Sequence, residues 1–496
     1  MSTPTAVVLQ FSPAPGTEST RLAKMRANMR ATAGKQCIAA IGFFLALVLL
    51  LGVAAPGMLR YGYPVLAFVV AAFLFWRSRT HYIGFVFWLW FVSPLVRRLV
   101  DYRAGFVPTN PLLLATFFAT AVSGYVLVTR LHSLSRADTL PFSCALAGIF
   151  FGAVIGLTRY PALAVAQALL NWITPVLFAF FLYDERQRYR EFQRVMERCL
   201  VYGMLVVGAY GVYQFFFLPV WDRAWMIDLG AQTFGVPEAL QIRVFSTLNA
   251  PATCAAYLMA GLLLLFALKG KLRFWAAAAA FVALVLTSSR SSWVGLCAGI
   301  AYLVLQLPGK ARLHAIAAVL ASVVVLGIVT QLPVIDDVVS QRIQSFTDPK
   351  NDVSFNERAD GHVAAFRDML AEPMGEGMGS VDTDHTTAGA DATIGPHDST
   401  ILELLYALGF PGTLLYLAGI AIAVAHIVRQ KNRRTGRPDI DRFAVSMCAI
   451  VIALLVQLAL NSIFVGPLGF LAWTAIAMTL AAGSLPRNPA AAPAAG

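Results

Sequence analysis

The stretch of sequence that decides the fold joins a polar segment to an apolar one, and residues 395–412 read GPHDSTILELLYALGFPG. Its first part contains Pro396, His397 and Asp398, whereas the residues from Ile401 onward are almost all apolar. This change predicts an apolar helix that begins near residue 401, with a histidine just before its N-terminus. The polar segment before it is the only long hydrophilic loop that the sequence predicts, so the fold depends on what the apolar stretches elsewhere form.

The composition of the chain is that of a membrane protein. Its 496 residues are 58% hydrophobic and 13% charged, and the mean hydropathy is +0.69. An ordinary soluble domain is about a quarter charged. The apolar runs lack the two-residue alternation of a transmembrane barrel and are long enough for helices that cross the bilayer. They are residues 37–56, 62–76, 81–96, 111–129, 140–158, 161–183, 199–219, 248–268, 272–288, 291–307, 313–332, 401–428, 443–461 and 464–483.

We therefore predict an all-α, polytopic integral membrane protein with about 12 transmembrane helices, in a range of about 12–14, and one long periplasmic loop that contains helices. The basic N-terminal segment is too long for a signal peptide, which favours an uncleaved first span. The expected organisation is a cytoplasmic segment at 1–36, a transmembrane bundle at 37–332, the periplasmic loop at 333–400, transmembrane helices at 401–483 and a disordered, Ala/Pro-rich cytoplasmic tail at 484–496.

The distribution of charge predicts the orientation. The net charge is +12. Lys and Arg lie mostly in every second one of the short segments between the apolar runs, and these segments are predicted to be cytoplasmic. The loop at 333–400 instead carries 13 of the 26 acidic residues against four cations. We expect both termini in the cytoplasm, the loop outside it, and no nucleic-acid partner. Arg97, Arg98 and Arg103 fall on the outer side in this arrangement, where contact with lipid headgroups is the expected explanation.

The cysteines and histidines do not predict a metal centre. The six cysteines lie in or beside apolar runs and form no CxxC motif, which indicates buried free thiols. His362, His385 and His397 share the acidic loop, but their spacing matches no HxxH or HExxH motif. We predict neither a metal nor another cofactor.

The loop itself is predicted to contain a helix. Residues 354–357 (SFNE) form a capping-box pattern, and the helix is expected to end near Ala371, before Pro373. One face of it is apolar, with Ala359, Val363, Phe366 and Leu370. The glycine-rich residues 374–379 that follow are predicted to be a flexible strip.

Four residues on the predicted outer side are candidates for chemistry: Arg243, Arg290, Arg358 and His397. Headgroup contact explains any single arginine there, but three beside one histidine also fit an anion site. Arg358 near a helix N-terminus opposes the helix dipole unless an anion binds there. His397 can act as a general base at neutral pH, or be an interfacial polar residue. Glu403 lies at a different helical phase and is expected to cap its helix or line the cavity.

These residues resemble the superfamily of O-antigen ligases and O-antigen polymerases, and the ligases most closely. Residues 243–249 (RVFSTLN) resemble its Arg-Val to Ser-Thr to Asn segment, and residues 289–291 (SRS) resemble its Ser-Arg turn. Residues 357–397, followed by Gly409 and Gly412, resemble its periplasmic loop and the next helix. The likeness covers roughly residues 200–430, whereas the first 190 residues match only in hydropathy.

The resemblance implies a metal-independent glycosyltransferase of the bacterial inner membrane with its active site facing the periplasm. The donor would be an O-antigen polysaccharide on undecaprenyl diphosphate, and the acceptor would be lipid A–core, both presented among membrane lipids. His397 would be the catalytic base, and Arg243, Arg290 and Arg358 would bind the donor diphosphate. Asn249, Ser289 and Asp398 would support them. Family members often have Asn or Ser at the position of Asp398, so its role stays open.

Two alternatives remain. Within the superfamily, the chain could be an O-antigen polymerase or a protein O-oligosaccharyltransferase, although it has no added soluble domain to bind a protein acceptor. From another class, it could be a solute transporter. Few ionisable residues lie inside the apolar runs, and no inverted repeat with paired broken helices is evident, which disfavours transport.

Overall fold

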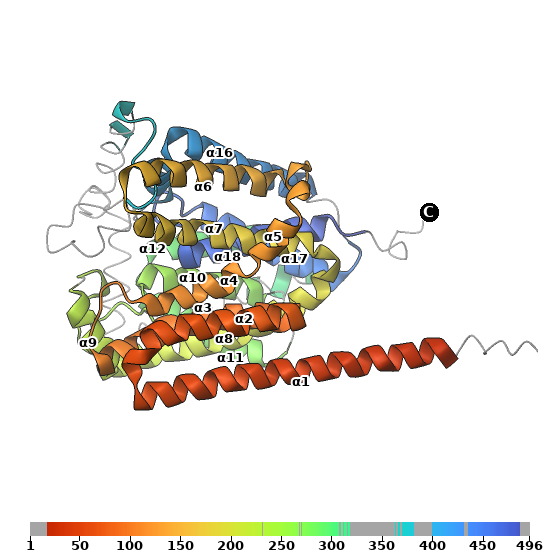
Figure 1. Cartoon of the computed structure of the whole chain (residues 1–496), viewed down its shortest axis with the longest axis horizontal. Coiled ribbons are helices and arrows are strands. Elements are labelled where there is room, and N and C mark those ends of the chain that lie inside the picture. The colour runs from red at the N-terminus through yellow and green to blue at the C-terminus, as the bar shows by residue number, and fades with distance from the viewer. Residues whose placement is uncertain are drawn as a thin grey trace, which may run out of the picture.

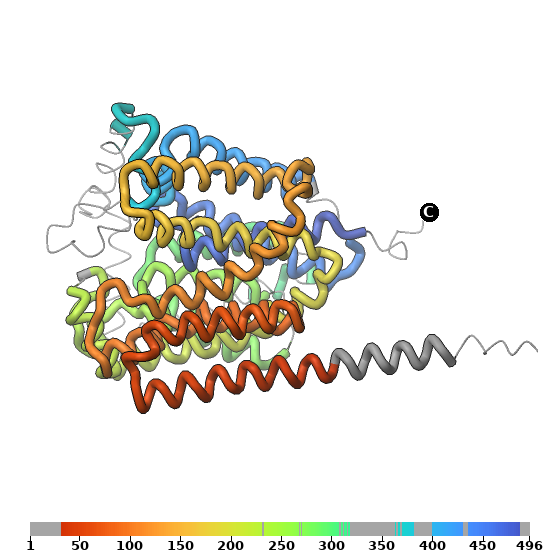
Figure 2. The backbone as a smooth tube through the Cα atoms, viewed as in Figure 1, coloured from red at the N-terminus to blue at the C-terminus, as the bar shows by residue number. Residues whose placement is uncertain are grey.

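The computed structural model describes most of the hydrophobic part of the chain (Figure 2). The described residues are 17–230, 232–266, 268, 270–306, 309–310, 312–314, 316–317, 363, 366–367, 370–380, 399–430 and 435–486. Among them the regular structure is helical, apart from one isolated antiparallel bridge between Gly235 and Ile242. The all-α prediction is therefore confirmed for this part of the chain.

The elements follow one another in an order that matches the apolar runs. The α-helices are α1 (Thr17–Ala54), α2 (Leu59–Arg77), α3 (Arg79–Ala104), α4 (Leu114–Ala121), α5 (Gly124–Thr129), α6 (Leu140–Arg159), α7 (Ala162–Asp184), α8 (Tyr189–Phe217), α9 (Val220–Leu229), α10 (Pro251–Leu265), α11 (Leu272–Leu286), α12 (Arg290–Gln306), α16 (Thr400–Gln430), α17 (Pro438–Leu455) and α18 (Gly466–Gly483). Short 3-10 helices are η1 (Pro56–Met58), η2 (Pro111–Leu113), η3 (Leu131–Ser135), η4 (Arg186–Arg188) and η5 (Gln232–Phe234).

Within the described residues, nine helical segments are long and apolar enough to cross a membrane. They include α1, α2, α3, α6, α7, α8, α16 and α18, and the η2–α5 segment supplies the ninth. α10 and α11 are apolar but have 15 residues each, so each is about 22 Å long against a hydrocarbon core of about 30 Å. The multi-pass membrane character is confirmed, whereas the count of twelve and the boundaries of the periplasmic loop stay predictions.

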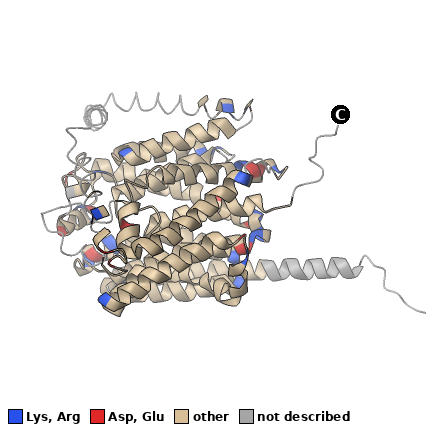
Figure 3. Cartoon of the chain, turned by 90° about the horizontal axis from the view of Figure 1, so that it is seen from above, with Lys and Arg blue, Asp and Glu red and all other residues tan. Residues whose placement is uncertain are grey.

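Successive long helices run in opposite directions through one bundle (Figure 1). Charged residues gather at its two ends, and the middle of the bundle has few of them (Figure 3). We name the ends by elements that they hold. The α9 end carries residues 218–230, 232–250 and 287–289, and the η4 end carries residues 130–139 and 185–188. A polar segment at each end of an apolar bundle is what a bilayer imposes on a spanning protein.

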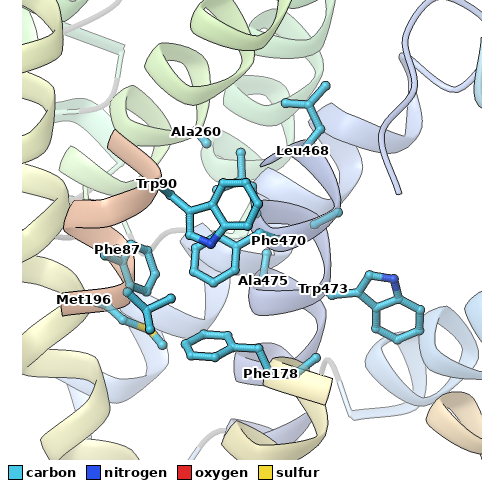
Figure 4. Close-up of a cluster of buried hydrophobic side chains, with 14 of the residues drawn as sticks. Phe87, Trp90, Phe178, Met196, Ala260, Leu468, Phe470, Trp473 and Ala475 are labelled. Carbon is cyan, nitrogen blue, oxygen red and sulfur yellow. The ribbon is translucent and has the colours of Figure 1, made fainter. Parts of the chain in front are cut away.

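The core of the bundle forms around α18, which is buried along almost its whole length. Phe470 on this helix stacks on Trp90 of α3, with ring centroids 5.3 Å apart and an interplanar angle of 22°. Phe178 of α7 and Phe87 of α3 also contact Phe470, with centroid distances of 4.9 and 5.1 Å (Figure 4). Aromatic packing of this kind fixes three helices from distant parts of the sequence against one another.

α16 packs along α6 through a row of glycines. Gly148, Gly152 and Gly156 are spaced by four residues on α6 and therefore share one face. A Cβ atom at Gly148 would lie 2.5 Å from the Gly412 oxygen, and one at Gly152 would lie 2.5 Å from the Ala407 oxygen. The two backbones thus approach more closely than any side chain would allow.

The glycine-rich strip after the loop helix is packed, so the prediction that residues 374–379 are flexible is wrong. The Met378 amide donates to the Gly152 oxygen at 3.1 Å, and the Met378 side chain is buried. The Glu376 and Gly377 amides both donate to the Tyr406 oxygen, at 3.0 and 3.1 Å. Glycine here supplies positive φ angles and close approach rather than freedom of movement.

The same strip explains a break in α16. Gly409 has φ 62° and ψ 179°, which interrupts the helix that the sequence predicts as one run. The Phe410 amide, freed from the helical pattern, donates to the Pro373 oxygen at 2.9 Å. A Cβ atom at position 409 would lie 2.2 Å from the Met374 oxygen, so only glycine fits there.

Candidate functional site

Arg243 lies across the C-terminal end of α11, at the α9 end of the bundle. Its guanidinium donates from Nε to the Thr287 oxygen at 3.2 Å and from Nη2 to the Ser288 oxygen at 3.5 Å. Nη1 donates to the Thr233 oxygen at 3.1 Å. The adjacent Val244 amide donates to the Leu286 oxygen at 3.1 Å, which holds the segment against the helix end. The last carbonyls of a helix have no partners within it, and a cation there is favourable.

The Ser289–Arg290 turn follows directly on these carbonyls. Ser288 has φ +53°, an uncommon conformation for a residue other than glycine, and this turns the chain from α11 into α12. Arg290 is the first residue of α12, and the Ser289 hydroxyl lies 3.3 Å from the Ser291 hydroxyl. The structure thus brings together two arginine motifs that are about 45 residues apart in the sequence.

A chain of polar side chains connects this turn to the start of α16. The Asn461 amide donates from Nδ2 to the Ser291 hydroxyl at 3.0 Å and to Gln457 Oε1 at 2.9 Å. The Asn461 carbonyl oxygen accepts from the Thr400 amide at 3.1 Å and from its hydroxyl at 2.6 Å. Sequence reasoning missed Gln457 and Asn461, although polar residues at the end of an apolar run are a recognisable signal of a functional or structural network.

α16 begins at Thr400, one residue before the start near 401 that the sequence predicts. The Ser399 hydroxyl accepts from the Ile401 amide at 3.2 Å and so caps the helix. Glu403 is buried in the first turn, and the Ser462 hydroxyl donates to its carboxylate. The polar start of this helix is therefore fixed to the turn that follows α17, close to the Arg290 side of the bundle.

Some of the predicted site residues lie outside the described residues. They are Arg358, His397 and Asp398. Asn249 belongs to the same segment as Arg243, and within the described part of the chain its side-chain oxygen is buried and accepts no hydrogen bond. No group of three or more His, Cys, Asp or Glu residues that could hold a metal ion occurs among the described residues.

A buried ion pair supports the Arg243 segment from behind. Arg98 of α3 and Asp222 of α9 are both inaccessible to solvent, and Arg98 Nη1 lies 3.0 Å from Asp222 Oδ1. Gln214 and Tyr210 donate to the other carboxylate oxygen, at 2.7 and 2.9 Å. Burial raises the pKa of the Asp222 carboxyl, and the Arg98 guanidinium opposes this rise. Four polar side chains are thus connected beneath the site by one ion pair and two hydrogen bonds.

The same network holds Ser246 in an uncommon backbone conformation. Ser246 has φ +52°, its amide and that of Phe245 donate to Gln214 Oε1 at 2.8 and 3.1 Å, and Arg98 donates to its carbonyl oxygen. The Ser246 hydroxyl donates to the Val207 oxygen. Backbone strain of this kind persists only where the surroundings enforce it. The shape of the segment from Arg243 to Asn249 is therefore imposed by its neighbours.

The expectation that Arg97, Arg98 and Arg103 contact lipid headgroups is wrong for Arg97 and Arg98, which are buried. Arg98 is paired with Asp222, and Arg97 Nε lies 3.2 Å from Asp101 Oδ2, where Arg97 is also buried. Arg103 donates to the Gly52 oxygen at 3.0 Å. The partners come from other elements or from one turn along the same helix, which the sequence does not reveal.

Comparison with known proteins shows which protein family the chain resembles. No curated protein matches the chain. Residues 275–417 match the family model described as O-antigen ligase, a range that contains the Ser289–Arg290 turn and ends after the Gly409 break. Members of this family are glycosyltransferase-like membrane enzymes, and in general the family implies a lipid-linked glycan and a lipid acceptor. Residues 275–417 are thus similar to the O-antigen ligase family, and this similarity supports a place for the chain in the O-antigen ligase superfamily.

Proposed function

We propose that the protein is an O-antigen ligase that transfers O-antigen polysaccharide from undecaprenyl diphosphate to lipid A–core at the periplasmic face of the inner membrane. The observation that carries the proposal is the contact of the Arg243 guanidinium with the Thr287 and Ser288 oxygens. It brings Arg243, which lies outside the matched range, beside the turn that holds Ser289 and Arg290, which lies inside it.

The two arginines supply what a diphosphate needs. The planar guanidinium donates two parallel hydrogen bonds to phosphate oxygens, and each charged bond contributes roughly 1.5–3 kcal/mol. Arg290 begins a helix, where free amide groups and the helix dipole also favour an anion. Arg358 is the proposed third ligand, because a cation in the first turn of its predicted helix is favourable only beside an anion.

His397 is the proposed base, two residues before Ser399 in the sequence. Its neutral imidazole takes the proton of the acceptor hydroxyl, and the oxygen attacks the anomeric carbon of the donor sugar. The bond between that carbon and the phosphate oxygen breaks, and undecaprenyl diphosphate leaves with the bonding electrons. Arginines stabilise the negative charge that grows on the leaving group. A single displacement of this kind inverts the anomeric configuration.

The supporting residues have narrower roles. We assign Ser289 to the shape of the arginine turn, since its hydroxyl lies close to the hydroxyls of Ser291 and Ser292. Asn249 is assigned to the donor side, because its segment continues from Arg243. Asp398 beside His397 would raise the pKa of the imidazole if the two side chains are in contact.

The direct test is His397→Ala in the full-length protein, reconstituted with the lipid-linked donor and lipid A–core. We expect ligation to fall by about 10²–10⁴-fold, because general-base assistance is lost, while donor binding is retained. His426→Ala, in the distant part of α16, is the matched control and should ligate normally. Normal ligation by the His397 variant would exclude it as the base.

The choice of acceptor separates the ligase from its relatives. One donor is offered in parallel to lipid A–core, to a lipid-linked repeat unit and to a pilin-like protein. Transfer to lipid A–core alone supports the ligase, and preference for either of the others identifies a polymerase or a protein O-oligosaccharyltransferase. Activity that is unchanged by EDTA supports metal independence, and loss that a divalent ion reverses contradicts it. Tracer uptake into vesicles without glycan transfer would point to a transporter.

A further inference from the structure

A second basic site lies at the η4 end of the bundle, away from the Arg243 segment. A cavity of about 420 Å³ opens there between the start of α8, the α10–α11 connection and the start of α17. Its lining contains five arginines and two carboxylates. The arginines are Arg190, Arg194, Arg198, Arg273 and Arg442.

The arginines converge because of their positions in the sequence. Arg190, Arg194 and Arg198 are spaced by four residues and therefore lie on one face of α8. Arg273 is in the first turn of α11, and Arg442 is in the second turn of α17. Three helices thus direct cations into one cavity, which is more than the scattered positive charge of membrane-flanking segments requires.

The two carboxylates only partly balance this charge. Asp439 Oδ2 lies 3.9 Å from Arg190 Nη2, and Glu197 accepts a hydrogen bond from Gln193 at 2.8 Å. Within the described residues, Arg194 and Arg198 form no ion pair, and both are exposed. The cavity therefore presents guanidinium groups that an anion would satisfy.

The position of the cavity is that of a membrane interface. Arg194 and Gln214, which binds the Arg243 segment, are separated by 20 residues of α8, or about 30 Å, which is the thickness of the hydrocarbon core. Tyr202 lines the cavity and is 51% exposed, and Phe274 and Trp275 beside it are 63% and 71% exposed. Exposed aromatic side chains of this kind mark the level of lipid headgroups.

The walls of the cavity combine the positive charge of the arginines with apolar side chains. Val201, Tyr202 and Leu272 line the cavity on the side of the exposed aromatics, and Leu268 lines it from within. A free inorganic anion would use only the arginines. A phospholipid would use both surfaces, with its phosphate among the guanidinium groups and its acyl chains along the apolar side chains.

We propose that this cavity binds the phosphate of an anionic phospholipid headgroup. The inference is independent of the proposed transferase activity, since none of the residues involved belongs to the Arg243 site. Bound lipid would cross-link α8, α11 and α17 at the η4 end of the bundle and so stabilise the protein.

The test titrates lipid into the full-length protein in a zwitterionic detergent and counts bound molecules by native mass spectrometry. We expect phosphatidylglycerol to bind and phosphatidylcholine to bind at least about tenfold more weakly. Arg194→Gln and Arg198→Gln should each weaken phosphatidylglycerol binding by about tenfold, because a charge-assisted hydrogen bond is lost. Arg136→Gln removes the same charge from an exposed position at the same end, outside the cavity, and should leave binding unchanged.

A variant with the opposite expected effect separates loss of a ligand contact from damage to the fold. Glu197→Gln removes a competing carboxylate and should strengthen phosphatidylglycerol binding. Equal binding by the wild type and both arginine variants would overturn the proposal. So would equal affinity for phosphatidylcholine, or displacement of the lipid by millimolar inorganic phosphate, which would identify a free anion as the ligand.

Discussion

Arg243 shows how a single residue serves structure and proposed chemistry together. Three backbone oxygens, of Thr233, Thr287 and Ser288, accept hydrogen bonds from its guanidinium. These contacts orient the side chain before any substrate arrives, which lowers the entropic cost of binding a diphosphate. Their fork-like geometry is specific to arginine, because the lysine ammonium is a single donor centre on a flexible stem.

We predict that Arg243→Lys retains the charge but lowers ligation by about tenfold or more, because at least one charge-assisted hydrogen bond is lost. The measurement is the rate of transfer to lipid A–core at saturating and at limiting donor. Arg223→Lys is the matched control, since Arg223 is exposed on α9 at the same end of the bundle. Wild-type kinetics in the Arg243 variant would show that the fork does not contribute to donor binding.

The Arg98–Asp222 pair predicts a large effect on stability. Arg98→Met leaves the buried Asp222 carboxylate without its cation, which costs about 3–5 kcal/mol in proteins. We expect a clearly lower thermal midpoint for the purified protein. Arg159→Met removes an arginine whose two partners, Glu372 and Glu376, both have solvent-accessible side chains, and should change the midpoint little. Equal midpoints for the two variants would contradict the structural role assigned to the buried pair.

At the scale of the elements, the contact between α6 and α16 connects the bundle to the loop. Gly156 of α6 accommodates the backbone of Met378, and Gly409 of α16 accommodates the backbone of Met374. Arg159 and Tyr160 at the end of α6 add contacts to Glu376, the tyrosine hydroxyl at 2.9 Å. The strip at 372–380 is thereby fixed between two helices, and it anchors the middle of the segment from 333 to 400 to the α9 end.

We predict that Gly156→Ala destabilises this contact. The added Cβ atom would lie 2.2 Å from the Met378 oxygen, so one backbone must move, and overpacking of this kind costs about 1–3 kcal/mol. Gly62→Ala on α2 is the control, because no atom lies within 4 Å of its added Cβ atom and alanine favours the helix. Faster proteolysis of the strip in the Gly156 variant alone is the expected readout. Equal protection in both would contradict the packing argument.

At the scale of the whole molecule, hydropathy predicts the helices but not how they break. The apolar run 401–428 predicts α16, yet the Gly409 break depends on a backbone more than thirty residues earlier. The run 111–129 becomes three short elements for reasons that the sequence does not show. The glycines among residues 374–379 predict a flexible segment, because glycine usually indicates conformational freedom, whereas here they permit contact with Gly152 and Tyr406. Hydropathy predicts which segments are buried on average, but contacts between distant segments determine where the helices break and which loops are packed.

The sequence predicts some residues of the candidate site but not the contacts between them. The motifs at Arg243 and Arg290 could be found in the sequence because both arginines fall on the predicted outer side of the membrane, where arginine is uncommon. Their direct connection through Thr287 and Ser288 could not be found, because it is made by backbone oxygens, which every residue has. The arrangement of Arg358 and His397 relative to these arginines stays a prediction.

The distribution of arginine predicts which end of the bundle faces the cytoplasm. At the α9 end, Arg97 and Arg98 are neutralised by buried carboxylates, and Arg103 and Arg243 are bound to backbone oxygens. Carboxylates therefore balance two of these four charges. The η4 end carries exposed arginines on several segments, including the three on α8. By the positive-inside rule we predict that the η4 end faces the cytoplasm and the α9 end the periplasm.

Truncation fusions test this orientation directly. We expect alkaline phosphatase fused after Gly230, at the α9 end, to be active, because the enzyme requires the oxidising periplasm, and a fusion after Arg188, at the η4 end, to be inactive. Fluorescent-protein fusions at the same positions should give the opposite pattern. Reversed activities would place His397 in the cytoplasm, away from a periplasmic acceptor, and would overturn the proposed ligase reaction even if the arginine geometry held.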